Sequence, residues 1–331
     1  MTRPVQGSRV PVGATTLLLS ILVTGLLAAC EEDTPERPAG DWPAAETLVA
    51  RDGLVWSAAN VVHLGDGSTV DVGEPIRAFV VAGDGIFYLG VGPGGHGWTD
   101  LRYAPADGGD VVKTGARPEP ESITVSPDGR HLGFVDRADV PAATVVVDLT
   151  TGTEVVSSND GLTDSEDLEA AYDEVEPAVL AIDDDSAWVK TLDGVLEFDL
   201  GSGESTASNR SADDVRPARP DVRTVPNPAG TWTIDNQSPG GPHLVAGNGR
   251  EVRAVLTEDD LSGPLTADPS TPWDDSTFWA LTRWLDDDTA VAIVAYGESL
   301  ILVACPVSTG DCAPLPGGGP DAHWPLDLPA P

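Results

Sequence analysis

Short runs of alternating apolar and polar residues, separated by clusters of turn-forming residues, recur along most of the chain. The segment ITVSPDGRHLGFV at 123–135 shows this clearly, because β-branched and apolar residues flank a Pro-Asp-Gly turn. Alternation places side chains on opposite faces of a strand, so the segment predicts a hairpin. Similar outlines occur at 47–56, 77–90, 179–190, 222–234 and 281–294.

Each of these predicted hairpins is followed by a second hairpin with a glycine in its turn. The second hairpins lie at 61–72, 101–114, 144–156, 195–206, 243–255 and 300–315. Their turn glycines, from Gly67 to Gly310, are separated by steps of 41, 44, 51, 46 and 61 residues. About four short strands in every ~40–45 residues indicate the blades of a β-propeller.

The third repeat carries a family resemblance. Its VSPDGRHLGFV, followed by VVVDLTTG, resembles the Ser-Pro-Asp-Gly repeat of TolB-type and WD-repeat-like bacterial β-propellers. The match is close in this repeat and loose in the others. Six repeats over about 45–315 imply an all-β fold of six four-stranded blades. The long steps and the tail at 323–331 leave a seventh blade open, and 164–177 has the composition of a short helical insertion.

The front of the chain differs from these repeats. Residues 1–29 carry only Arg3 and Arg9 as charges, and an apolar segment runs from about Val10 to Leu27. This is the layout of a secretion signal, and the segment is shorter than the roughly 20 residues that a membrane-spanning helix needs.

The end of this segment, Leu27-Ala28-Ala29-Cys30, resembles the lipobox of bacterial lipoproteins. In that family the cysteine receives a diacylglyceryl group and the peptide before it is removed. The resemblance implies a signal peptide at 1–29, a lipidated Cys30 with a flexible tether at 30–44, and a propeller domain at 45–331. An ordinary signal peptide that leaves Cys30 as a free thiol is the alternative. We expect a protein held by lipid on the extracytoplasmic face of the cell membrane.

The charge of the chain limits its partners. It has 18 basic and 54 acidic residues, and a formal net charge of −36. Phosphate binding needs a basic surface, so we expect no nucleic acid as a partner. An anionic lipid surface would also repel the folded part, so the lipid must be the membrane anchor. The remaining partner is expected to be an envelope protein or a small ligand.

The other two cysteines, Cys305 and Cys312, flank a Ser-Thr-Gly turn. Two β-like runs place them opposite each other, or nearly so, across a hairpin, and an oxidising compartment favours a disulfide between them. A zinc site is disfavoured, since no further Cys or His lies nearby at ligand spacing.

Few residues stand out as carriers of chemistry. The acidic triplets at 183–185 and 286–288 fall at turns of the repeat, which favours solvated turns over a metal site. We expect no metal, no cofactor and no catalytic set from local motifs. Three tryptophans expected in loops or insertions are candidates for a contact surface: Trp98, Trp273 and Trp279.

These observations predict a binding or scaffolding module. An extracytoplasmic propeller enzyme, either a hydrolase or a lyase with its site in the axial funnel, is the alternative, because propellers support both. A purely structural envelope component is a third interpretation.

Overall fold

A computed structural model describes most of the predicted propeller domain. The described residues are 42–51, 53–92, 97–138, 141–162, 176–216, 223–239, 241–256, 279–296, 299–315, 322–323 and 325. The predicted signal peptide, Cys30, Trp273 and nearly all of the predicted helical insertion at 164–177 lie outside them. No helix in the described part of the chain is both long and apolar enough to cross a membrane.

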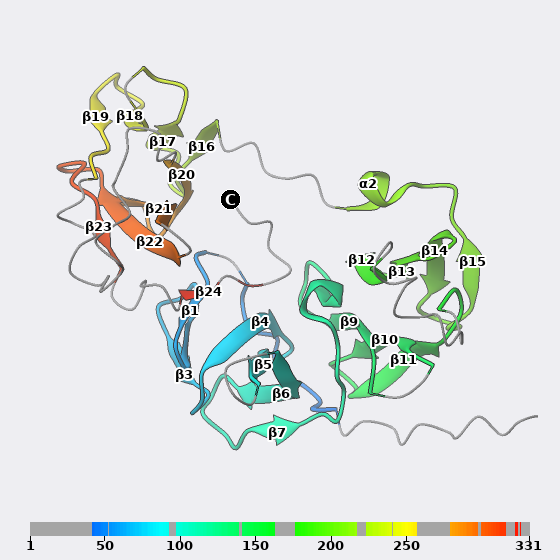
Figure 1. Cartoon of the computed structure of the whole chain (residues 1–331). Helices are drawn as coiled ribbons and strands as arrows, with labels where there is room; N and C mark the ends of the chain where they lie inside the picture. The colour runs from blue at the N-terminus through cyan, green and yellow to red at the C-terminus, as the bar shows by residue number, and fades with distance from the viewer. Residues whose placement is uncertain are drawn as a thin grey trace, which may run out of the picture. The chain divides into compact units, whose positions relative to one another are not determined.

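The described strands form six antiparallel sheets of four strands each (Figure 1). The first two sheets contain β24 (Ala322–His323), β1 (Trp56–Ala58), β2 (Val61–His63) and β3 (Thr69–Asp71), and then β4 (Ile76–Ala82), β5 (Gly85–Val91), β6 (Trp98–Pro105) and β7 (Val112–Lys113). The third and fourth contain β8 (Thr124–Val125), β9 (His131–Asp136), β10 (Ala143–Asp148) and β11 (Thr153–Ser158), and then β12 (Ala178–Ile182), β13 (Ser186–Thr191), β14 (Gly194–Asp199) and β15 (Ser205–Ala207). The last two contain β16 (Thr224–Pro226), β17 (Trp232–Asp235), β18 (His243–Ala246) and β19 (Glu251–Arg253), and then β20 (Trp279–Trp284), β21 (Thr289–Tyr296), β22 (Ser299–Pro306) and β23 (Ala313–Pro314).

The first sheet joins the two ends of the repeat region. Strand β24 pairs with β1, with Ser57 opposite His323, so the C-terminal segment completes this sheet (Figure 1). In the described residues, the tail therefore supplies a strand of the first blade and not of a seventh. The predicted hairpin at 47–56 is wrong, because residues 47–51 and 53–55 form no strand and the inner strand of this blade is β24. The described sheets are the six blades of an all-β propeller fold.

The core lies mainly between successive sheets. Separate clusters of buried apolar residues join β24 and β1–β3 to β4–β7, then β4–β7 to β8–β11, and then β8–β11 to β12–β15. Two further clusters join β16–β19 to β20–β23, and β20–β23 to β1. Alternate side chains of each strand point to opposite faces of its sheet, so one sheet can contribute to two of these clusters.

The third repeat shows why the sequence folds locally as it does. In its turn, the Asp128 carboxylate accepts the Ser126 hydroxyl (2.6 Å) and the Arg130 N–H (3.0 Å). Gly129 has φ +79°, in the left-handed region that favours glycine. The Ser126 hydroxyl oxygen accepts a hydrogen bond from the His131 N–H (2.8 Å). The residues Ser-Pro-Asp-Gly therefore specify one closed turn.

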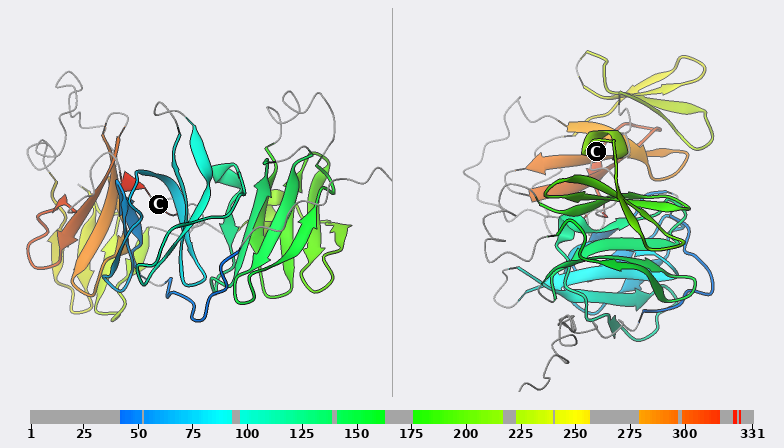
Figure 2. Two further views of the ribbon diagram at one scale, coloured as in Figure 1. Left: turned by 90° about the horizontal axis from the view of Figure 1, so that it is seen from below. Right: turned by 90° about the vertical axis from the view of Figure 1, so that its right-hand side faces the viewer.

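Residues 42–51 and 53–55, which we call the N-terminal strap, contain no strand and run along the turn ends of three sheets. Trp42 is buried against Phe134, with ring centroids 5.6 Å apart, and its Nε1–H donates to Glu154 (2.9 Å). The Ala45 N–H donates to Leu149 O and the Val49 N–H to Gly83 O, each at 2.7 Å. The strap, coloured dark blue in Figure 2, is therefore an integral part of the fold.

One short α-helix is described, α2 (Ala212–Val215), and it differs from the predicted insertion at 164–177. Ser211 caps it, and Ser211 and Asp214 exchange the two hydrogen bonds of a capping box. Val215 of this helix packs on Leu180, Trp188 and Val195 of the fourth sheet.

Candidate functional site

A groove opens where the N-terminal strap passes the turns of the first two sheets. Its volume is about 1020 Å³. One wall is strap residues 43–50, and the others are the β2–β3, β4–β5 and β6–β7 turns. We call it the strap groove, and the residues used below are Glu46, Leu48, Val49, Leu64, Asp66, Asp84, Tyr103 and Asp107.

Backbone hydrogen bonds fix the shape of this groove. The Val49 N–H donates to Gly83 O, which ties the strap to the β4–β5 turn. The Gly83 N–H in turn donates to Gly129 O (2.8 Å) in the neighbouring sheet. The walls are therefore held by main-chain contacts between three segments far apart in sequence, so the groove is formed by the folded backbone.

The groove is acidic. Four carboxylates line it, those of Glu46, Asp66, Asp84 and Asp107, and none of the described lining residues is Lys, Arg or His. Hydrogen bonds from the hydroxyl and main-chain N–H of Ser68 lower the pKa of Asp66, so this carboxylate is charged near neutral pH. Such a lining favours cationic ligands.

Tyr103 forms the polar part of the groove floor. Its ring is buried, and its hydroxyl donates to the Asp84 carboxylate. Burial raises the pKa of Tyr103, and the hydrogen bond to Asp84 and the charge of Asp84 raise it further. The phenol therefore stays protonated and keeps the Asp84 carboxylate in a fixed position.

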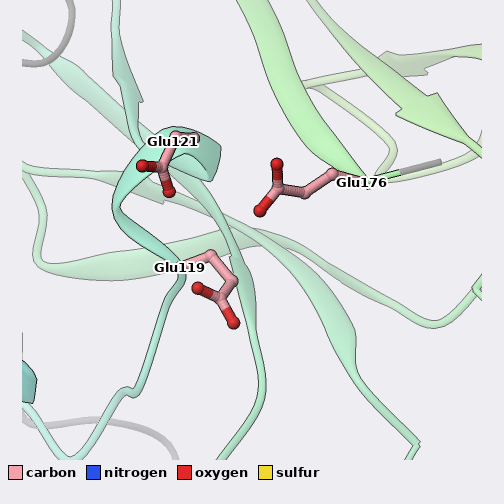
Figure 3. A group of neighbouring side chains, drawn as sticks. All are labelled: Glu119, Glu121 and Glu176. Atoms are coloured by element: carbon pink, nitrogen blue, oxygen red, sulfur yellow. The ribbon is translucent and has the colours of Figure 1, made fainter. Parts of the chain in front are cut away.

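A second acidic group lies near the third and fourth sheets (Figure 3). Glu119 and Glu121 belong to the segment around the 3₁₀ turn η2 (Pro120–Ser122), and Glu176 comes just before β12. Their carboxylate oxygens lie within 4.8 Å of one another. Carboxylate oxygens are the donors that hard cations prefer. This trio is the candidate cation site in the described part of the chain, where the sequence predicted no metal.

Arg137 already balances part of this charge. Its Nη1 contacts the Glu119 carboxylate at 2.5 Å. Burial raises the pKa of Glu119, the charges of Glu176 and Glu121 raise it too, and Arg137 opposes them. The trio therefore stores repulsion between carboxylates, which a bound cation or a proton would relieve. The spacing in sequence between Glu121 and Glu176 leaves no local motif that could have shown this contact.

A third polar group lies at the opposite end of the second sheet from the strap. The Tyr88 hydroxyl donates to Glu74 (2.8 Å), and Arg102 forms an ion pair with the same carboxylate. Burial raises the pKa of Tyr88 to about 12. The Tyr88 side chain is fully buried, and its hydrogen bond to Glu74 and the ion pair of Arg102 tie β5 and β6 to the loop before β4.

The structure places the residues singled out from sequence in different regions. Cys305 and Cys312 are joined by a disulfide across the β22–β23 hairpin and are both buried. Trp98 begins β6 and Trp279 begins β20, so the expectation that they lie in loops is wrong. Trp279 is half-buried and packs against the cluster between the fifth and sixth sheets. Cys30 and Trp273 lie outside the described residues.

The acidic triplets occupy turns, as their composition indicated. Asp183 accepts the N–H groups of Asp185 and Ser186, and Asp286 accepts the N–H of Asp288. The middle residue of the second triplet, Asp287, accepts the N–H of Ala229 (2.8 Å) and so links the fifth and sixth sheets. These carboxylates therefore have structural roles.

The six four-stranded sheets of the described residues define a six-bladed β-propeller. Comparison with solved structures finds distant similarities. TolB from Acinetobacter baumannii is 13% identical, with 82% of this chain and 65% of that chain covered and a TM-score of 0.35. A putative TolB from Agrobacterium tumefaciens is also 13% identical, with 78% and 86% covered and a TM-score of 0.31. The β-propeller domain of the Trilobed protease from Pyrococcus furiosus is 12% identical, with 72% and 84% covered and a TM-score of 0.32.

At these identities and TM-scores the similarities carry no argument about function. This chain spans slightly less than two thirds of the length of the Acinetobacter protein. No protein-family model matches the sequence, and no curated protein matches it. The function must therefore be argued from the residues themselves.

Proposed function

We propose that this protein is a membrane-anchored extracytoplasmic lipoprotein whose β-propeller binds a partner in the cell envelope. The observation that supports the anchor is the apolar segment that ends in Leu27-Ala28-Ala29-Cys30. Each buried CH₂ of an acyl chain contributes about 0.8 kcal/mol to membrane binding, so two long chains on Cys30 hold the protein firmly. Residues 31–41 then connect the lipid to the N-terminal strap.

The observation that supports binding is the strap groove. It combines carboxylates with apolar residues such as Leu48 and Leu64 in a concave surface whose walls are fixed by main-chain hydrogen bonds. The chain as a whole carries a formal charge of −36. Opposite charges steer encounter, so a basic or neutral partner would meet this surface quickly and in a salt-dependent way.

Metabolic labelling with a fatty-acid analogue tests the anchor. Cys30→Ser removes the thiol that would carry the lipid, so we expect the variant to lose the label and to remain uncleaved at this position. The matched control is the double variant Cys305→Ser/Cys312→Ser, which also removes thiols but should keep the label. Persistence of the label in Cys30→Ser would show that the anchor is misassigned.

A second candidate contact surface, predicted from sequence at Trp98, Trp273 and Trp279, needs a test that separates binding from stability. Trp279 packs against the core, so Trp279→Ala would weaken the fold whether or not the residue touches a partner. Trp273→Ala is the informative variant. We expect it to keep the thermal midpoint and to reduce crosslinking to a partner in intact cells, whereas unchanged crosslinking would remove Trp273 from the surface.

A further inference from the structure

We infer that the strap groove binds a short basic peptide segment of a partner protein, with cationic and apolar side chains interspersed. This inference rests on the proposed binding function and specifies its site and ligand class.

The charge of the groove sets the sign of the ligand. Glu46, Asp66 and Asp107 are exposed, and Asp84 is half-buried. None of the described lining residues supplies a positive charge. An anionic or neutral polar ligand would leave four carboxylates uncompensated in one concavity, whereas Lys or Arg side chains would pair with them.

The spacing of the carboxylates indicates an extended ligand. In the described part of the chain, three acidic groups come within 4.8 Å of one another at Glu119, Glu121 and Glu176, and not in the strap groove. The groove carboxylates come from the strap and from three separate turns. A single metal ion needs its ligand atoms around one point, so these positions suit several separate cationic groups.

The apolar lining indicates that charge alone does not describe the ligand. Leu64, two residues before Asp66, lines the groove as part of the buried core, and Leu48 and Val49 on the strap line it and are partly exposed. An extended peptide directs successive side chains to opposite sides, so it can present a basic group to a carboxylate and an apolar group to these residues. A polyamine offers the charges without the apolar side chains.

Two groove carboxylates can be changed with little risk to the fold. Glu46 and Asp107 are exposed, whereas the Asp66 carboxylate accepts a hydrogen bond from Ser68 and the Asp84 carboxylate accepts one from Tyr103. In Glu46→Gln/Asp107→Asn each side chain keeps an acceptor oxygen, so the weak turn contact from the Gly109 N–H to residue 107 can persist. The matched control is Asp193→Asn/Glu204→Gln, two exposed carboxylates of the fourth sheet with the same change in total charge.

Fluorescence anisotropy of the full chain in detergent, with a labelled alternating Leu-Arg peptide, tests the inference. We expect the groove variant to weaken binding by about fivefold and the control variant by less than about twofold, since each exposed ion pair contributes modestly. A photo-crosslinker in the peptide should attach to the strap or to the β2–β3 and β6–β7 turns. Both readouts are independent of lipidation, so a failure here is distinguishable from a failure of Cys30→Ser labelling.

Three outcomes would overturn the inference. Equal loss of affinity in the two variants would mean that the peptide responds only to total charge. Crosslinks spread over all sheets would also mean that the peptide responds only to total charge. Binding of spermine as tight as that of the Leu-Arg peptide, with the same sensitivity to Glu46→Gln/Asp107→Asn, would show that the groove recognises charge without apolar side chains.

Discussion

The interface between β4–β7 and β8–β11 is filled by large apolar side chains, whereas the face of β16–β19 that points away from β20–β23 is polar. The first contains Phe87, Phe134, Leu101 and Leu132, all at most 1% exposed, and the strap adds Trp42. The strand pairing identifies the residues on the face of β16–β19 that points away from β20–β23. None of them is buried: Thr224, Pro226, Thr233, Asp235, His243, Val245, Glu251 and Arg253.

The difference shows that the blades are not equivalent in what holds them. Among the described residues, clusters of buried apolar side chains connect five pairs of neighbouring sheets, and none joins β12–β15 to β16–β19. On the fourth sheet, α2 and its Val215 pack on the corresponding face. The fifth sheet therefore obtains its apolar burial from the sixth, and its stability depends on that one cluster.

The largest expected effect comes from breaking the apolar interface. Phe134→Ala removes a fully buried ring between the second and third sheets and should lower the free energy of unfolding by about 3–5 kcal/mol. Thr233→Ala on the polar face should change it by less than about 0.5 kcal/mol. Urea unfolding followed by circular dichroism measures both, and a loss below about 1 kcal/mol for Phe134→Ala would mean that the site collapses around the missing ring.

The second prediction concerns the disulfide that supports the cluster under the fifth sheet. Cys305 and Cys312 are seven residues apart and both belong to that cluster. Loop-closure entropy gives about 2–3 kcal/mol for so short a loop, so Cys305→Ala/Cys312→Ala should destabilise the fold by that amount. Hydrogen exchange should rise most in β16–β23.

Thiol counting on unfolded, non-reduced protein is the direct check on this bridge. The exported protein should show no free thiol from these two residues. Two free thiols would contradict the disulfide and remove its contribution to the fifth and sixth sheets.

The third prediction addresses the helix on the fourth sheet. Ser211→Ala removes the capping hydrogen bond that the Asp214 N–H donates to the Ser211 hydroxyl oxygen, and should cost about 1 kcal/mol of local stability. Amide exchange is expected to rise in α2 and in β13 beneath it, while β8–β10 stay unchanged. The control is Ser202→Ala, at an exposed turn of the same sheet. Equal amide exchange in the two variants would mean that α2 does not protect this face of the sheet.

Much of the blade pattern is predictable from sequence because it is local. The third repeat is the clearest case. Ser126 and Asp128 form the hydrogen bonds that close its turn, and Gly129 adopts the positive φ that the turn requires. The hairpin of Cys305 and Cys312 is local as well. Gly310 in its turn approaches Arg253 O so closely that a Cβ would lie 2.2 Å away, which only the fold reveals.

The remaining features depend on contacts between distant segments. The strap alternates apolar and polar residues like a strand, so its sequence does not show that β24 takes the inner position of the first blade. Trp279 lies at the start of β20, where an apolar side chain can serve the core or a surface with the same local sequence. The strap groove and the trio of Glu119, Glu121 and Glu176 also unite residues more than 50 positions apart, which a single sequence does not reveal.

The smallest expected effect is on the pH dependence of stability, and it concerns the face of β9 that points to the fourth sheet. His131 at the start of β9 is 5% exposed, and burial lowers its pKa. Asp148, Asp128 and Asp184 act in the opposite direction, and Arg130 reinforces the shift. The folded protein therefore binds a proton at His131 less readily than the unfolded chain does.

The sign of this effect follows from proton linkage. Because the unfolded state binds more protons, stability rises with pH across the range in which His131 titrates. The contribution of neutral His131 is complete above the ordinary histidine pKa of about 6.5 and is lost as the pH falls from there toward the lowered pKa of the folded state. His131→Gln should flatten the dependence of the urea midpoint on pH between about 7 and 5. Burial also lowers the pKa of His63. A His63→Gln variant therefore measures how much of the pH dependence comes from that histidine and not from His131. If His131→Gln leaves the slope of the parent protein unchanged, the buried imidazole does not couple protonation to packing between the third and fourth sheets.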